Sequence, residues 1–86
     1  MSTHHPPRHC FTEARFYATE QVAILHFTEG EFYRYPNFTL ADWLQLKSAV
    51  HHGKTYNALV RRPNRVLLGF DRQGEFAPGA DDTFYN

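Results

Sequence analysis

Hydrophobic and polar positions along the first third of the chain predict three strands. Residues 11 to 19 are rich in aromatic side chains and alternate weakly, which favours a strand. Residues 22 to 28 are β-branched and aromatic, and residues 32 to 35 follow after a turn that contains Gly30. The second and third strands are therefore expected to pair as a β-hairpin.

The register of this hairpin depends on the length of its loop. With a loop of three residues, Phe27 pairs with Tyr33. In the same register Leu25 pairs with Tyr35. With a loop of two residues, Phe27 pairs with Phe32 instead. We favour the longer loop, because it places the four side chains of its two pairs on one face of the sheet.

A first helix is expected after Pro36, which ends the third strand. Thr39 can be its N-cap, and Asp42 at N3 completes a capping box, so the helix is expected to run from there to about residue 50. Gly53 is then expected to end it in the left-handed conformation. Its core face is predicted as a wide apolar stripe at helical spacing, made of Leu40, Trp43, Leu44, Leu46, Ala49 and Val50.

A second, shorter helix is expected from about residue 54 to 62, with Tyr56, Leu59 and Val60 at i, i+3, i+4 spacing. An apolar stretch at 66–70 predicts the last strand. The elements follow the order β-β-β-α-α-β. We therefore predict an α+β fold, an antiparallel meander of three to four strands with two consecutive helices packed on one face.

Chain length and composition set the domain boundaries. A chain of 86 residues has room for one modest core, which we expect at residues 11–72. Residues 1–10 are expected to be a flexible tail, and residues 73–86 a flexible acidic tail. No apolar run is long enough to span a membrane. Cys10 is the only cysteine, which favours a reducing, cytoplasmic location.

Charge is distributed unevenly although the formal net charge is zero. Residues 47 to 72 carry two Lys and four Arg against one Asp, whereas the segments on either side are acidic. His51 and His52 can add positive charge at lower pH. An electropositive face is expected if the fold gathers these side chains on one side.

A series of spaced residues runs through the centre of the chain: an apolar strand, a glycine turn, a Tyr-x-Tyr pair, an aromatic residue in a helix and a Gly-x-x-Tyr-Asn segment. The matched residues are Leu25, Phe27, Gly30, Tyr33, Tyr35, Asn37, Trp43, Leu46, Ala49, Gly53, Tyr56, Asn57, Val60 and Arg61. In this spacing the sequence resembles the KTSC domain from about residue 16 to 61. It departs from the family pattern at Thr39, His51 and Thr55, and it lacks the tyrosine that usually follows shortly after the matched arginine.

The KTSC family also occurs at the C-terminus of lysyl-tRNA synthetases and as free-standing proteins of bacteria, phages and plasmids. The resemblance therefore implies an association with RNA or with machinery that handles nucleic acid. It implies no catalytic residues, and we expect no enzyme activity and no cofactor.

The candidate binding residues come from the helix junction and the basic segment. They are Lys47, His51, His52, Lys54, Asn57, Arg61, Arg62 and Arg65. At the junction, the free N–H groups that start the second helix can receive a phosphate, with Lys54 adding charge. The alternative is structural: Gly53 caps a helix, Asn57 bonds the loop, Tyr56 fills the core and the cations form a solvated face.

Metal binding and catalysis are weaker interpretations. If Met1 is removed, His4 becomes the third residue behind a free amine and can bind Cu(II) or Ni(II), but any unstructured segment with a third-position histidine does so. His9 and Cys10 are adjacent, which does not fit a zinc site. No carboxylate close in sequence is available to orient His51 or His52 for acid–base chemistry.

We therefore expect a small non-catalytic binding protein, encoded by a phage or mobile element. Its expected partner is a protein complex that handles nucleic acid, for example a host defence nuclease such as a CRISPR complex that it inhibits. Direct RNA or DNA binding through residues 47–72 is the alternative. A homodimer is left open, because an exposed strand edge next to many aromatic residues favours association.

Overall fold

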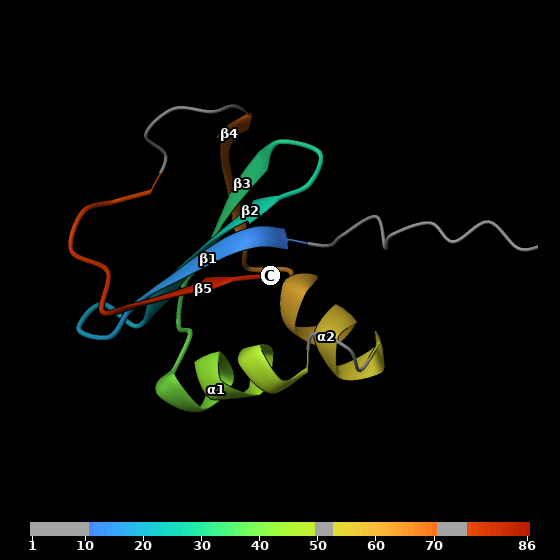
Figure 1. Ribbon diagram of the computed structural model, residues 1–86, viewed down its shortest axis with the longest axis horizontal. Coiled ribbons are helices and arrows are strands. Elements are labelled where there is room, and N and C mark those ends of the chain that lie inside the picture. The colour runs from blue at the N-terminus through green and yellow to red at the C-terminus, as the bar shows by residue number, and fades with distance from the viewer. Residues whose placement is uncertain (1–10, 50–52, 71–75) are drawn as a thin grey trace, which may run out of the picture.

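The computed structural model describes residues 11–49, 53–70 and 76–86, which form one antiparallel sheet and two helices (Figure 1). The strands are β1 (Phe11–Tyr17), β2 (Val22–Phe27), β3 (Glu31–Tyr35), β4 (Val66–Phe70) and β5 (Asp82–Tyr85), and the helices are α1 (Leu40–Ser48) and α2 (Gly53–Val60). The strand order across the sheet is β4-β3-β2-β1-β5. The predicted α+β fold with two consecutive helices is confirmed, and the sheet has one strand more than the largest number expected.

The start of α1 confirms the predicted capping box. The Thr39 hydroxyl accepts a hydrogen bond from the Asp42 backbone N–H at 3.2 Å, and the Asp42 carboxylate accepts one from the Thr39 N–H at 3.0 Å. The predicted end is wrong. The helix stops at Ser48 with Ala49 as its C-cap, whereas Gly53 is the first residue of α2 and is not among the residues with positive φ.

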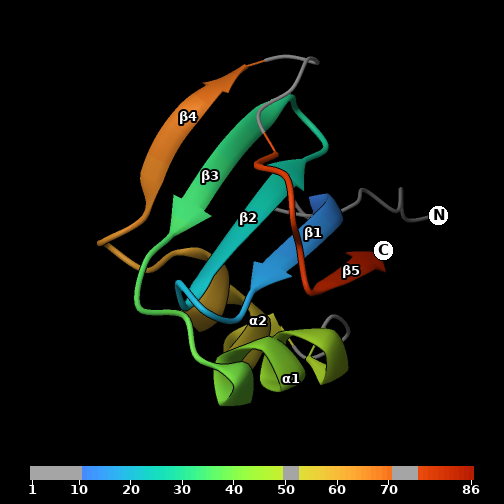
Figure 2. The same cartoon turned by 90° about the vertical axis from the view of Figure 1, so that its left-hand side faces the viewer.

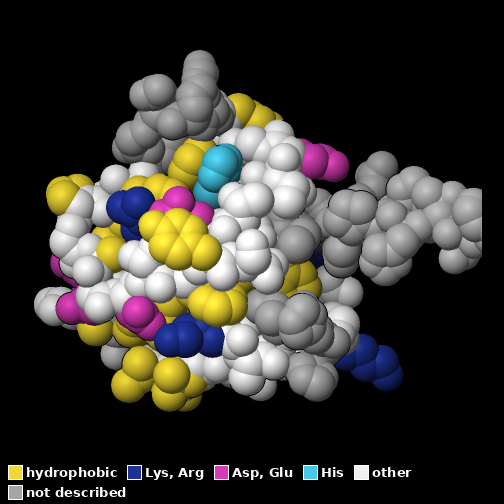
Figure 3. Space-filling view, viewed as in Figure 1, with side chains coloured by type: hydrophobic (Ala, Val, Ile, Leu, Met, Phe, Trp, Pro, Cys, Tyr) yellow, Lys and Arg dark blue, Asp and Glu magenta, His cyan; other side chains and the backbone are white. Residues whose placement is uncertain are grey.

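The apolar face of α1 is narrower than the predicted stripe. Trp43, Leu46 and Ala49 are buried, but Leu40 is 58% exposed and Leu44 is 53% exposed. Leu40 and Leu44 are four residues apart and share a side of the helix that does not face the sheet. Figure 3 shows exposed hydrophobic side chains over the first part of α1, at the lower left of the view.

The β2–β3 hairpin differs in register from both sequence-based alternatives. Leu25 pairs with Tyr33, and Ala23 pairs with Tyr35. Gly30, with φ of 101°, closes the turn by donating its N–H to the carbonyl of Phe27 at 2.9 Å. The register is two residues away from the favoured one. Because side chains alternate with period two, a shift of two keeps the predicted face correct.

The main core lies between the sheet and the two helices. Its largest fully buried side chains include Trp43 and Tyr35, and Tyr33 packs against the same cluster while half-buried. The ring of Trp43 stacks on Phe16 with centroids 5.4 Å apart, and the rings of Phe11 and Tyr56 stack at 5.9 Å. Both helices therefore contribute to one aromatic core with β1, β2 and β3.

The C-terminal segment covers the opposite face of the sheet, as Figure 2 shows. A second cluster there contains Tyr17, Val22, Ile24 and Phe32, with Leu68, Phe76 and Ala80 packed against it. The Tyr17 hydroxyl donates to the carbonyl of Ala77 at 2.7 Å. The chain then adds β5 to the free edge of β1.

The expected flexible tail at 73–86 is therefore wrong where the structure describes it. Asp81 accepts a hydrogen bond from the Ala18 N–H and donates its own N–H to Phe16, both at 2.7 Å. Its neighbour Asp82 is bound by α1. The acidic pair that suggested a solvated tail instead anchors a strand, and the domain extends to the last residues of the chain. The expected N-terminal tail at 1–10 lies outside the described residues.

Candidate binding surface

Lys47 is tied to the fold through Asp82. Its ammonium nitrogen lies 2.8 Å from Asp82 Oδ2 and 5.8 Å from the centre of the Trp43 ring. The indole Nε1 of Trp43 donates to the same carboxylate oxygen at 2.9 Å. The hydrogen bond from Lys47, followed by that from Trp43, lowers the pKa of Asp82. Lys47 thus joins α1 to β5 and is not a free cation.

Arg62 is also held by a carboxylate, here that of Asp42 in the first turn of α1. Its guanidinium makes a two-point contact with the Asp42 carboxylate at 2.8 and 3.2 Å and lies 5.1 Å over the Phe38 ring. Burial raises the pKa of Asp42, but the hydrogen bonds from Arg62 and from the Thr39 backbone outweigh it, so the pKa is lowered. This pair links the end of α2 to the capped start of α1.

Arg65 packs at the edge of the core, in contact with Tyr33 and with the end of α2. Its guanidinium donates to the carbonyl of Val60 at 2.7 Å and stacks 4.1 Å from the centre of the Tyr33 ring. The Tyr35 hydroxyl donates to the same Val60 carbonyl at 2.6 Å. Burial raises the pKa of Tyr35 to about 12, although its hydrogen bond with Arg65 acts in the opposite direction.

A row of exposed polar side chains runs along the outer side of α2. Lys54, Asn57 and Arg61 are exposed, and none of the three has a side-chain partner among the described residues. Their spacing of three and four residues places them on one side of the helix. We call these three residues the α2 row. His51 and His52, the other candidates near this row, lie outside the described residues.

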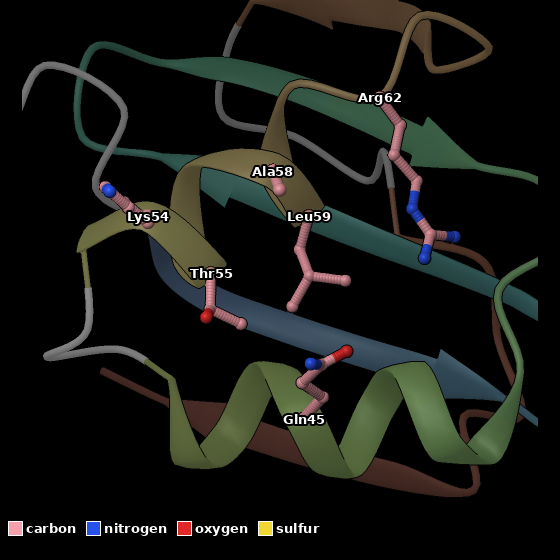
Figure 4. Close-up of a pocket in the computed structure, with 6 residues that line it drawn as sticks. All are labelled: Gln45, Lys54, Thr55, Ala58, Leu59 and Arg62. Atoms are coloured by element: carbon pink, nitrogen blue, oxygen red, sulfur yellow. The ribbon is translucent and has the colours of Figure 1, made fainter.

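Lys54 of the α2 row also lines an open hollow of about 510 Å³ between the two helices (Figure 4). Gln45 rises from α1 toward Thr55 and Leu59 of α2, as Figure 4 shows. The lining residues are Gln45, Lys54, Thr55, Ala58, Leu59 and Arg62. Cations therefore stand at two points of the rim, and the wall between them combines apolar and uncharged polar groups.

Four residues of the hollow were missed from the sequence: Gln45, Thr55, Ala58 and Leu59. The signal for three of them was present, because Lys54, Ala58 and Arg62 are four residues apart and Thr55 and Leu59 are also four apart. These two series define one side of α2. The position of Gln45 opposite them depends on how α1 packs, which the sequence pattern does not state.

The described part of the chain contains neither a candidate metal centre nor a membrane-spanning helix. Within it, no group of three His, Cys, Asp or Glu side chains is arranged to hold a metal ion. The segment with His4, His5, His9 and Cys10 lies outside it. In the same part of the chain, neither helix is long and apolar enough to cross a membrane.

Comparisons with family models, with curated proteins and with solved structures find no match for this chain. The resemblance to the KTSC domain therefore stays a prediction that rests on the spacing of its residues.

Proposed function

We propose that this protein is a non-catalytic binding protein that contacts a protein partner through the α2 row and the neighbouring hollow. One observation supports this proposal most directly. Lys54 and Arg61 are exposed cations without a side-chain partner among the described residues, and Lys54 lies on the rim of the hollow. A partner with acidic side chains facing the row fits this charge.

The pairing of the other cations favours a protein partner over nucleic acid. Binding to duplex DNA gains affinity from each phosphate that a free cation neutralises. Lys47 and Arg62 instead contact the carboxylates of Asp82 and Asp42, which would repel phosphates nearby. Arg65 is bound to a backbone carbonyl and an aromatic ring. With three of its cations already paired, this basic surface is better suited to a protein partner, which offers apolar, polar and charged groups, than to a row of phosphates.

The hollow has the mixture that protein interfaces use. Ala58 offers exposed apolar surface next to the buried Leu59, Thr55 and Gln45 offer hydrogen-bonding groups, and charged groups stand at the rim. Interfaces of this kind place apolar contacts at the centre and polar groups at the edge. A partner segment would be complementary to the hollow if it placed an apolar side chain against the wall and acidic side chains against the cations at the rim.

The finer parts of the proposal rest on the sequence. The resemblance to the KTSC domain favours a partner that handles nucleic acid, and the small size favours a protein encoded by a phage or mobile element. Inhibition of a host defence nuclease such as a CRISPR complex, in the cytoplasm, is the role that combines these features.

The test reverses charge in the α2 row. The double variant Lys54→Glu, Arg61→Glu should lose binding to a partner captured by the wild-type chain while its melting curve is unchanged. Arg34→Glu is the matched control, because Arg34 is exposed on β3 and has no side-chain partner among the described residues. Retained binding in the double variant would move the contact elsewhere.

A second measurement separates the two partner classes. Affinity for duplex DNA or RNA is measured across a salt series, next to the affinity for the captured protein. Phosphate contacts require a steep decline, with a slope of about 0.9 per phosphate on duplex DNA. Such a decline, with no captured protein, would replace the proposal by direct nucleic-acid binding.

A further inference from the structure

Strand β4 forms an outer edge of the sheet. It pairs antiparallel with β3 on one side, from Val66 opposite Arg34 to Phe70 opposite Glu31. No described element pairs with its other side, as Figure 2 shows. Its outward N–H and C=O groups therefore lack a strand partner in the described part of the chain, which is the condition for pairing with a further strand.

Three of the five residues of β4 have apolar side chains that are exposed. Val66 is 49% exposed, Leu67 is 45% exposed and Phe70 is 62% exposed. None of the five residues of β4 carries a charge. The usual protection of an edge strand by lysine, by proline or by inward charges is missing here. What remains is its short length and one register shift between the positions opposite Phe32 and Tyr33.

The opposite edge is different in chemistry. Strand β5 begins with Asp82, whose carboxylate is held by Lys47 and Trp43. A β4 strand that paired with β5 of another copy would also leave a free β4 and a free β5 at the two ends, which leads to open chains of molecules. Pairing of β4 with β4 uses both free β4 edges and closes.

We propose that β4 pairs antiparallel with β4 of a second copy of this chain, forming a two-fold symmetric dimer with one continuous sheet. An antiparallel strand pair is symmetric about a two-fold axis, so each strand is a complete partner for its own copy. The neutral β4 places no like charges opposite each other. The zero formal net charge of the chain adds no long-range repulsion.

The size of the contact sets the expected affinity. Five residues of β4 with three exposed apolar side chains make an interface at the small end of the range for specific complexes, below about 1,200 Å² in total. Interfaces of this size are weak and reversible. The dimer is therefore expected to dissociate at low micromolar concentration and to be the main species near millimolar concentration.

Sedimentation equilibrium of the full chain tests this directly. The wild type should shift from monomer to dimer mass with rising concentration and stop at dimer. Leu67→Lys and Leu67→Glu should each stay monomeric, because each places like charges near the two-fold axis. Leu44→Lys is the matched control: it introduces the same charge at an exposed leucine of α1, away from β4, and should dimerise as the wild type does.

A mixture of the two Leu67 variants adds a test that does not depend on loss of binding. Opposite charges meet across the axis, so the mixture should form a mixed dimer although neither variant forms one alone. This gain also shows that both variants are folded. A wild type that stays monomeric near millimolar concentration overturns the proposal. So does a mass that grows beyond dimer, or a dimer that persists in both Leu67 variants.

Discussion

Trp43 combines several interactions in one side chain. It is 1% exposed, stacks on Phe16 in the main core, and donates a hydrogen bond to Asp82 from its indole nitrogen. Trp43→Ala removes the ring and leaves a cavity between α1 and the sheet. We expect the free energy of unfolding to fall by about 3–5 kcal/mol, as for other large aromatic residues cut back to alanine in a core.

Chemical denaturation of Trp43→Ala, Trp43→Phe and Leu44→Ala separates packing from hydrogen bonding. The phenylalanine variant keeps most of the apolar contact and should recover more than half of the loss. Leu44 is 53% exposed on the same helix, so its alanine variant should change stability by no more than about 0.5 kcal/mol. A Trp43→Ala variant as stable as the wild type would contradict the helix-to-sheet packing described above.

Tyr35 provides a prediction at alkaline pH. Burial raises its pKa to about 12, above the ordinary value of 10.0. The folded chain therefore holds this proton more tightly than the unfolded chain does. Its contribution to stability is complete below pH 10 and is lost as the pH rises from there to about 12. Burial also raises the pKa of Tyr17. Absorbance titration should therefore show tyrosine ionisation extending above the ordinary range, and Tyr35→Phe should remove the part of it that lies near pH 12. A normal titration of all five tyrosines would contradict its burial.

The distance along the chain decides which residue contacts the sequence could predict. The contact between Thr39 and Asp42 spans three residues, and helix-capping chemistry identifies it without knowledge of the fold. The contact of Lys47 with Asp82 spans 35 residues and that of Arg62 with Asp42 spans 20. These pairings depend on how α1, α2 and β5 pack together. The sequence therefore presented Lys47 and Arg62 as free cations, and only Lys54 and Arg61 are free of side-chain partners among the described basic candidates.

At the scale of elements, periodicity predicted the faces and missed the ends. Alternation in β2 and β3 was enough to place Leu25 and Tyr35 on the core face, but the exact pairing depended on a turn whose length the pattern does not fix. The end of α1 was missed for a similar reason. Gly53 suits a helix end in sequence terms, and here it begins the next helix.

The C-terminal segment is the element whose role was least visible in the sequence. Its strand is four residues long, begins at Asp82 and follows directly after Asp81, and aspartate is uncommon in strands. It covers the second face of the sheet because Phe76 contacts the Phe32 ring edge-on, with centroids 5.2 Å apart, and Arg15 lies over the Phe76 ring at 4.2 Å. These contacts are all long-range.

Removal of residues 76–86 should therefore unfold or strongly destabilise the protein. It exposes Tyr17 and Phe32 on one face of the sheet, frees the edge of β1 and leaves Lys47 without its carboxylate partner. Circular dichroism and thermal melting measure the effect. Removal of residues 1–10 serves as a control of similar length and is expected to preserve the fold. A truncated chain that melts like the wild type would contradict the role of β5.

At the scale of the whole molecule, the fold brings aspartates from the acidic segments on either side of residues 47–72 onto that basic segment. Asp42 from the first half binds Arg62, and Asp82 from the last residues binds Lys47. The uneven charge seen in the sequence is in this way partly neutralised. Among the basic candidates that the structure describes, the expected electropositive face is reduced to Lys54 and Arg61 of the α2 row. The total charge of a segment is thus a poor guide to its exposed charge when its partners come from elsewhere.

The same two ion pairs make a prediction about acid stability. The pKa values of Asp42 and Asp82 are both lowered from the ordinary value of 3.8, by hydrogen bonds from Arg62 and Lys47 respectively. A depressed pKa in the folded chain stabilises the fold at pH values above 3.8, and this contribution is lost as the pH falls below 3.8 through the folded-state pKa. Urea unfolding midpoints measured from neutral pH down to about pH 2 should therefore decline most steeply below pH 4.

Two variants assign this decline to its source. Asp82→Asn and Asp42→Asn should each lower the midpoint at neutral pH and flatten the decline below pH 4, because the titrating carboxyl is gone. Glu29→Gln, at an exposed carboxylate without a side-chain partner among the described residues, should leave both unchanged. If the Asn variants decline as steeply as the wild type, acid sensitivity arises from other carboxyls. The ion pairs from α1 to β5 and from α1 to Arg62 would then contribute little to the stability of the fold.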